Sequence, residues 1–133
     1  VNQIELHPYH SQPATQKADA ALGIVTQAWS PIGGITFYPG PWGDERRNVM
    51  QDDTIGAIAA AHGKSISQVT LRWHVERGDI VFPKSMKRER MEENFAIFDF
   101  ELSPEEIDAI SALDRGEDGR RGPNPDTFDY VPA

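Results

Sequence analysis

The chain has 133 residues, a mass of 14.8 kDa and no cysteine, and its formal net charge is −8, from 21 acidic residues against 13 Lys and Arg. These totals exclude disulfides and thiolate metal sites, and the acidic balance argues against nonspecific binding to nucleic acid or to an anionic membrane. No apolar run reaches the ~20 residues that cross a bilayer, and the start does not read as a signal peptide, so we expect a cytoplasmic protein.

Strand and helix patterns alternate along the chain. Short apolar or β-branched runs predict strands at residues 1–6, 24–29 and 80–82. Helical composition with start and stop signals predicts helices at residues 13–22, 53–62, 66–77, 87–95 and 104–113. The alternation predicts parallel strands joined by crossover helices, and hence an α/β fold.

Capping boxes mark the starts of two of these helices. Ser65 with Gln68, and Ser103 with Glu106, are spaced so that each pair can satisfy two free backbone N–H groups. Two segments lack periodicity altogether. Residues 33–49 are predicted to form a long loop, and loops of this length are often functional. Residues 114–133 are predicted to form an extended tail.

A local reversal of charge lies between Asp79 and Asn94. The apolar run 80–82 is typical of a buried strand, Pro83 ends it, and a helix start follows at once. Cations crowd around this turn, namely Lys84, Lys87, Arg88 and Arg90. Together with backbone N–H groups and the helix dipole, they predict a phosphate site. The alternative is a solvated basic turn, which is the commoner meaning of a charge run.

In α/β folds, ligands gather at the carboxyl ends of the strands. Here those ends carry His-Pro-Tyr at residues 7–9, Trp-Ser-Pro at 29–31 and Pro-Lys-Ser at 83–85. We therefore expect these three short segments to meet at one site.

At these strand ends the sequence closely resembles the aldo-keto reductase family, NADP(H)-dependent carbonyl reductases built on a (β/α)8 barrel. The matching stretches are VNQIELHPY at 1–9, QAWSPIG at 27–33, and VFPKS at 81–85 followed by Arg90, Glu93 and Asn94. Within this family, the sequence most resembles bacterial reductases of the diketogluconate reductase type. The resemblance implies the C-terminal portion of a TIM-type barrel in residues 1–113, with three parallel strands and incomplete on its own, and a tail in residues 114–133.

The resemblance implies a site for the nicotinamide end of NADP(H). Gln3 would hydrogen-bond the carboxamide, and Trp29 would stack on the nicotinamide ring. Ser30 and Ile32 would line the path of the pyrophosphate and ribose. A planar amide and an indole face suit these roles, although ordinary strand-end packing is the alternative for Gln3 and Trp29.

The adenosine end falls on the basic stretch. By resemblance, Lys84, Ser85 and Arg90 would hold the 2′-phosphate, which Arg can grip with two parallel hydrogen bonds. The Met86 backbone would lie beside it. Two further residues, Glu93 and Asn94, would reach the adenine, and a solvated helix face is the alternative for both.

The family's hydride chemistry uses an Asp, Tyr, Lys and His tetrad that precedes the position matched by Val1, so we expect no catalytic residue in this chain. Tyr9 and His7 are capable of acid–base chemistry but match the His-Pro-Tyr motif instead. We expect His7 to bind nearby backbone, and we expect the other histidines, His10, His62 and His74, to be turn or helix-surface residues. We expect no metal site, since His62 and His74 lack the spacing of ligands.

The start at Val1, inside a predicted strand, indicates part of a longer enzyme that reduces an aldehyde or ketone with NADPH. We expect this chain alone to be inactive and to self-associate through open barrel edges, and the full-length protein to be monomeric. Aromatic residues of the loop and tail would shape the substrate pocket: Phe37, Tyr38, Trp42, Phe128 and Tyr130. The alternatives are a non-catalytic NADPH-binding regulatory member, an inactive truncated fragment, and another barrel enzyme with a phosphate-bearing ligand.

Overall fold

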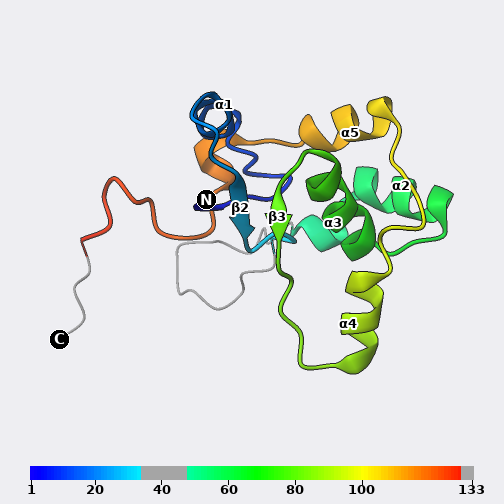
Figure 1. Ribbon diagram of the computed structural model, residues 1–133. Helices are drawn as coiled ribbons and strands as arrows, with labels where there is room; N and C mark the ends of the chain where they lie inside the picture. Colours follow the sequence, from blue (N-terminus) through cyan, green and yellow to red (C-terminus); the bar gives the residue numbers. More distant parts are fainter. Residues whose placement is uncertain (34–47, 130–133) are drawn as a thin grey trace.

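A computed structural model describes residues 1–33 and 48–129. Three parallel strands form one sheet in the order β1–β2–β3 (Figure 1). The strands are β1 (Asn2–Glu5), β2 (Thr26–Trp29) and β3 (Ile80–Val81). Parallel neighbours need crossover connections. The helix α1 (Pro13–Ala21) lies between β1 and β2, and α2 (Asp53–His62) and α3 (Ile66–Glu76) lie between β2 and β3, which confirms the predicted alternation.

The register gives the sheet two chemically different faces. Ile4 lies beside Ala28, which lies beside Val81, and all three belong to or pack against the hydrophobic core. Because side chains alternate along a strand, the next residues of each strand point to the opposite face. Ile80 on that face is 40% exposed, and Phe82 beyond the strand is 45% exposed. The expectation of a buried strand at 80–82 is therefore wrong, because even the core-facing Val81 is only half-buried.

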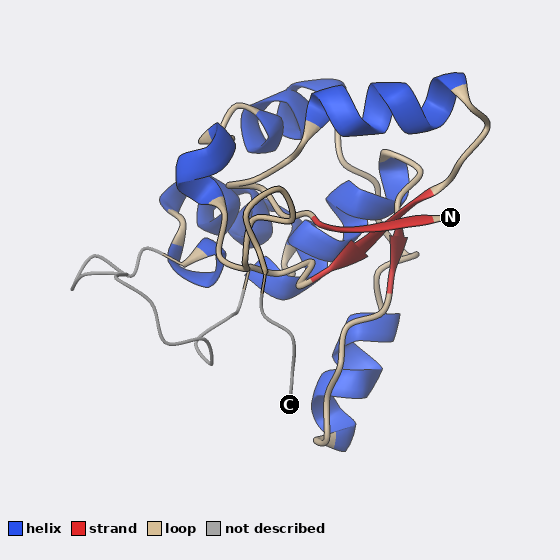
Figure 2. Cartoon of the chain, turned by 90° about the vertical axis from the view of Figure 1, so that its left-hand side faces the viewer, coloured by secondary structure: helices blue, strands red, loops and turns tan. Residues whose placement is uncertain are grey.

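The core lies between the sheet and the helices. Its buried members come from β2, α2, α3, α5 (Pro104–Ser111) and the connecting segments, and include Leu6, Ala28, Ile55, Val69, Trp73 and Ile110. Helix α4 (Arg88–Phe95) buries none of its residues, and it contacts α3 through Glu93 and Asn94 near its C-terminal end; Figure 2 shows it projecting from the rest of the chain. The basic loop before α4 is therefore held away from the core.

Both predicted capping boxes are present. Ser65 caps α3 with Gln68, and Ser103 caps α5 (Pro104–Ser111) with Glu106. Two short 3-10 helices are present: η1 (Val49–Gln51) begins at the last residue of the predicted loop, and η2 (Gly116–Gly119) lies in the predicted tail. Four aromatic residues assigned to the substrate pocket, Phe37, Tyr38, Trp42 and Tyr130, lie outside the described residues.

Candidate functional site

One face of the sheet carries three polar or aromatic side chains toward the carboxyl ends of β1 and β2. Gln3 and Glu5 are two residues apart and therefore share a face, and Glu5 pairs with Trp29 across the ladder. Gln3 is exposed, Trp29 is half-buried, and Glu5 is buried. The structure thus brings the amide of Gln3 and the indole of Trp29 to one accessible surface.

A tight turn follows Trp29. Ser30 has φ of 53°, a left-handed conformation that costs free energy in any residue other than glycine, and its carbonyl accepts a hydrogen bond from Gly33 N at 2.8 Å. The next carbonyl oxygen, of Pro31, lies 2.9 Å from His74 Nε2 and can accept a hydrogen bond from it. The turn that contains the half-buried Ile32 is therefore fixed from the core side.

The histidine that supports this turn is fully buried. His74 lies on α3, and its Nδ1 is 3.1 Å from Asp79 Oδ2. His10 is also buried, with Nδ1 at 2.8 Å from the Gly116 carbonyl oxygen. The prediction of a helix-surface position is wrong for His74, which α3 carries into the interior. His10 closes the turn at residues 7–10, as predicted, although it is buried, and His62 is half-buried and pairs with Glu106.

The basic loop presents cations to solvent. Within residues 1–33 and 48–129, Lys84 and Arg90 form no ion pair, whereas the neighbouring Arg88 pairs with Glu92 at 2.8 Å. Ser85 Oγ accepts from Lys87 N at 3.1 Å, which folds the loop into the start of α4. No side chain caps that helix start, and Met86 is 85% exposed. The loop therefore offers unneutralised charge and helix-terminal N–H groups to an anion.

Glu93 and Asn94, at the other end of α4, are held by α3. Glu93 Oε1 accepts a hydrogen bond from the Ser65 hydroxyl, and Asn94 Oδ1 accepts from Ser67 Oγ at 3.2 Å. Asn94 also borders a cavity of about 400 Å³ beside β3, whose other walls are mostly apolar and include Leu71, Val81, Met91 and Phe98. These contacts fix the orientation of α4 relative to α3.

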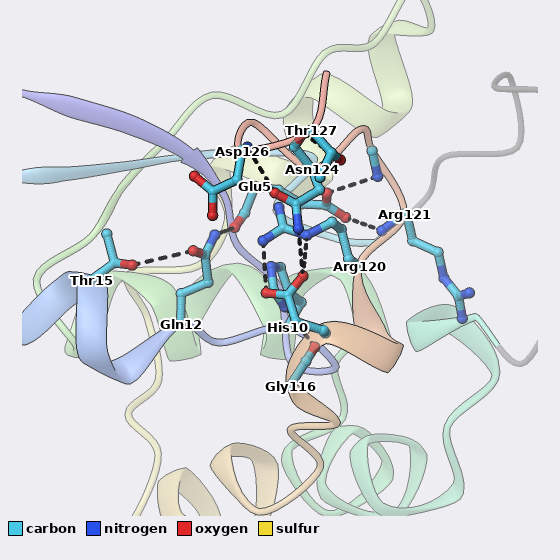
Figure 3. A network of polar contacts seen from close by, with 12 residues as sticks. Glu5, His10, Gln12, Thr15, Gly116, Arg120, Arg121, Asn124, Asp126 and Thr127 are labelled. Atoms are coloured by element: carbon cyan, nitrogen blue, oxygen red, sulfur yellow. Dashed lines mark hydrogen bonds and ion pairs between the residues drawn. The ribbon is translucent and has the colours of Figure 1, made fainter. Parts of the chain in front are cut away.

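Sequence reasoning missed Glu5 as a residue of the site. Its carboxylate accepts hydrogen bonds from Arg121 N at 2.6 Å (Figure 3) and from Gly122 N at 2.8 Å. It also lies 3.0 Å from His7 Nε2. Burial alone would raise the pKa of Glu5, but these hydrogen bonds outweigh it and hold the pKa below its ordinary value. The one available signal is an acidic residue between Ile4 and Leu6 in an otherwise apolar strand end.

His7 and Tyr9 have structural partners. Burial lowers the pKa of His7, partly offset by Glu5, so the neutral ring donates to that carboxylate near pH 7. The Tyr9 hydroxyl donates to Asp52 Oδ2 at 2.7 Å, and the Arg115 guanidinium lies 3.9 Å from the centre of the Tyr9 ring. His7 thus binds a side chain rather than the backbone, and Tyr9 joins the start of α2 to the strand end.

Two further findings concern residues 1–33 and 48–129 alone. None of their helices has the length and apolar character required to span a bilayer. They also hold no group of three or more His, Asp or Glu side chains arranged to bind a metal ion.

Phe128, the one described aromatic residue of the predicted pocket, is 55% exposed.

Comparison with known proteins gives consistent matches. The family model described as "Aldo/keto reductase family" matches residues 1–115. An aldo-keto reductase of Mycolicibacterium smegmatis is 44% identical over 131 residues, which are 98% of this chain and 42% of that protein. Morphine 6-dehydrogenase of Pseudomonas putida is 46% identical over 97% of this chain, and glyoxal reductase of Bacillus subtilis is 40% identical over 95% of it.

A crystal structure of a Gox0644 mutant in complex with NADPH superposes on 97% of this chain with a TM-score of 0.81 and 38% identity. The chain spans 43% of that structure and 41% to 43% of the three relatives. The three strands and their helices are therefore part of a TIM-type barrel that is incomplete within this chain.

Proposed function

Since this chain belongs to the aldo/keto reductase family, we propose that it is the cofactor-binding part of an NADPH-dependent reductase that converts aldehydes or ketones to alcohols. The observation that carries the proposal is the pair of unneutralised cations, Lys84 and Arg90, at the start of α4. The solved relative with NADPH bound supports the choice of cofactor.

The adenosine 2′-phosphate is assigned to the basic loop. A dianionic phosphate accepts several charge-assisted hydrogen bonds. The loop and the start of α4 offer the ammonium of Lys84, the hydroxyl of Ser85 and the guanidinium of Arg90. The uncapped start of α4, beyond Met86, adds backbone N–H groups and the positive end of a helix dipole. The residues present therefore fit a nucleotide phosphate.

The nicotinamide end is assigned to the open sheet face. Gln3 is exposed there and can exchange two hydrogen bonds with a carboxamide, while the half-buried Trp29 offers a face for stacking. The turn at Ser30 and Ile32 follows β2, the strand between β1 and β3, and we assign it to the pyrophosphate and ribose between the two ends of the dinucleotide. Glu93 and Asn94 are assigned to the adenine through the polar atoms that Ser65 and Ser67 leave available.

When bound, NADPH supplies the hydride that reduces the carbonyl carbon. The part of this chain is to bind and orient the dinucleotide, because its Tyr9 and His7 are engaged by Asp52 and Glu5. We assign the proton donor, and the rest of the catalytic tetrad, to sequence outside this chain. The chain alone is then inactive. The substrate is a small carbonyl compound, and aromatic residues of the loop and tail shape the pocket that binds it.

The same proposal takes residues 1–113 as the barrel portion and residues 114–133 as the tail. It keeps the cytoplasmic location and the monomeric full-length protein that the sequence led us to expect.

The experiment compares two neighbouring arginines in the full-length protein. Arg90→Ala removes a proposed phosphate ligand, and we expect about 10- to 100-fold weaker NADPH binding with unchanged NADH binding. Arg88→Ala is the matched control, because Arg88 is equally charged and close by but pairs with Glu92. An unchanged preference for NADPH in Arg90→Ala would show that the phosphate assignment is wrong.

A further inference from the structure

We propose that Glu5 is a positioning residue that holds the C-terminal tail against Trp29 and thereby fixes one wall of the substrate pocket. This inference rests on the proposed function, because it places the wall beside the residue assigned to the nicotinamide. Nothing in the composition or periodicity of the sequence joins Glu5 to the tail, which lies 116 residues further along the chain.

The contact is made by both carboxylate oxygens. Oε1 accepts from Arg121 N at 2.6 Å, and Oε2 accepts from Gly122 N at 2.8 Å, so two successive backbone amides are held by one side chain (Figure 3). The side chain of Glu5 is shielded from solvent, and His7 Nε2 lies 3.0 Å from Oε1 on the other side. A buried carboxylate with three donors is a strong and directional anchor.

The anchored segment touches Trp29 directly. A Cβ placed on Gly122 would lie 2.2 Å from Trp29 Cη2 and 3.0 Å from Glu5 Oε2. The backbone at Gly122 therefore lies on the edge of the indole, at a distance that no other residue type permits. Since Glu5 and Trp29 are neighbours in the ladder, the carboxylate sets where the tail crosses the site.

The tail reaches this point from an anchored base. Arg115 N donates to the Tyr9 carbonyl at 3.0 Å, and Ser11 N donates to Asp114 Oδ1 at 3.0 Å. His10 Nδ1 also lies 2.8 Å from the Gly116 carbonyl oxygen. These contacts hold the base of the tail beside the end of β1, and Glu5 determines the path of residues 121 and 122 from there.

The test replaces Glu5 by its isosteric amide in the full-length enzyme. Glu5→Gln keeps the shape of the side chain, but its NH₂ group must face a donor, either a tail N–H or His7. We expect exchange of the tail amides at 121 and 122 to become about tenfold faster, the factor expected for one lost hydrogen bond. Glu101→Gln is the matched control, since it makes the same charge change on an exposed side chain.

The functional readout separates this role from a merely structural one. We expect Glu5→Gln to raise KM for the carbonyl substrate about tenfold, with smaller changes in kcat and in the Kd of NADPH. Gly122→Ala, which leaves the carboxylate intact and displaces the tail from Trp29, should raise KM in the same way. Its control is Gly56→Ala, whose Cβ would meet Ile66 at an ordinary 3.8 Å.

Unchanged exchange of the tail amides in Glu5→Gln would overturn the anchor. Faster exchange with an unchanged KM in both Glu5→Gln and Gly122→Ala would overturn its role at the substrate pocket. If Glu5→Gln does not fold, exchange in the wild type decides the anchor, since unprotected amides at 121 and 122 would overturn it, and Gly122→Ala decides the role at the substrate pocket. Amide exchange needs no substrate, so the anchor can be confirmed or refuted even if the wild-type protein fails to bind NADPH.

Discussion

The Tyr9 hydroxyl provides a sharp test of which residues support the site and which perform chemistry. Tyr9→Phe removes the hydroxyl that donates to Asp52 Oδ2 at 2.7 Å but keeps the ring, which stays in the core and under the Arg115 guanidinium. Because a hydrogen bond to a charged acceptor contributes about 1.5–3 kcal/mol, we expect that loss in the free energy of unfolding. We expect kcat and KM of the full-length enzyme to remain as in the wild type.

Asp52 also caps helix α2, so its replacement should lower the free energy of unfolding by more than Tyr9→Phe does. Its Oδ1 accepts from Thr54 N at 2.9 Å and Ile55 N at 3.1 Å, so it is the N-cap of α2. Asp52→Ala loses this cap, worth about 1–2 kcal/mol, as well as the contact with Tyr9, for a total of about 2.5–5 kcal/mol. Asp53→Ala is the control and should cost only about 0.3–1 kcal/mol through the helix dipole, since Asp53 is exposed in the first turn.

Urea unfolding of the two single variants and the double variant measures the coupling. The double variant should cost no more than Asp52→Ala alone, which gives a coupling of about 1.5–3 kcal/mol. A loss of about 100-fold or more in kcat for Tyr9→Phe would refute this reasoning, because that is the contribution of a general acid. Additive costs would refute the proposed link between Tyr9 and Asp52.

Two further predictions concern pH and packing. In the folded chain, burial lowers the pKa of His7, and the hydrogen bonds that Glu5 accepts lower the pKa of Glu5. As the pH falls through the ordinary pKa values of 6.5 and 4.5, the unfolded chain therefore takes up protons before the folded chain does, and this favours unfolding. The urea midpoint should therefore fall as pH drops from 7 through 5 to 4; a midpoint that rises would contradict both assignments. Gly119→Ala places a Cβ 1.6 Å from the Tyr9 carbonyl oxygen, so it should lower the free energy of unfolding by about 1–3 kcal/mol or more. A variant as stable as the wild type would show that the backbone at Gly119 does not pack this closely against Tyr9.

Local rules predict the helices of this chain well. The hydroxyl of Ser65 and the amide of Gln68 satisfy each other's neighbouring N–H groups, and Ser103 does the same with Glu106, so both helix starts follow from four residues each. Gly63 and Gly78 lie just beyond helices with φ of 63° and 82°, as the sequence suggests. Strand ends and the basic turn could likewise be placed, because their signals are contiguous.

Burial of polar side chains could not be predicted in the same way. His74 is covered by Pro31, 43 residues away, and His10 by Gly116, 106 residues away, and no local pattern reports such packing. The link between Glu5 and Gly122 is equally nonlocal. A polar residue that sequence reasoning assigns to the surface is thus the kind of residue whose role only the tertiary structure reveals.

The proposed cofactor site is tested most directly by the ratio of the Kd values for NADH and NADPH, measured by tryptophan fluorescence on the full-length protein. Lys84, Ser85 and Arg90 have no counterpart to bind on NADH, which lacks the 2′-phosphate. We predict that NADPH binds at least about tenfold more tightly, and that raising the salt concentration reduces this difference. Equal affinities for the two cofactors would show that the basic loop does not bind the 2′-phosphate.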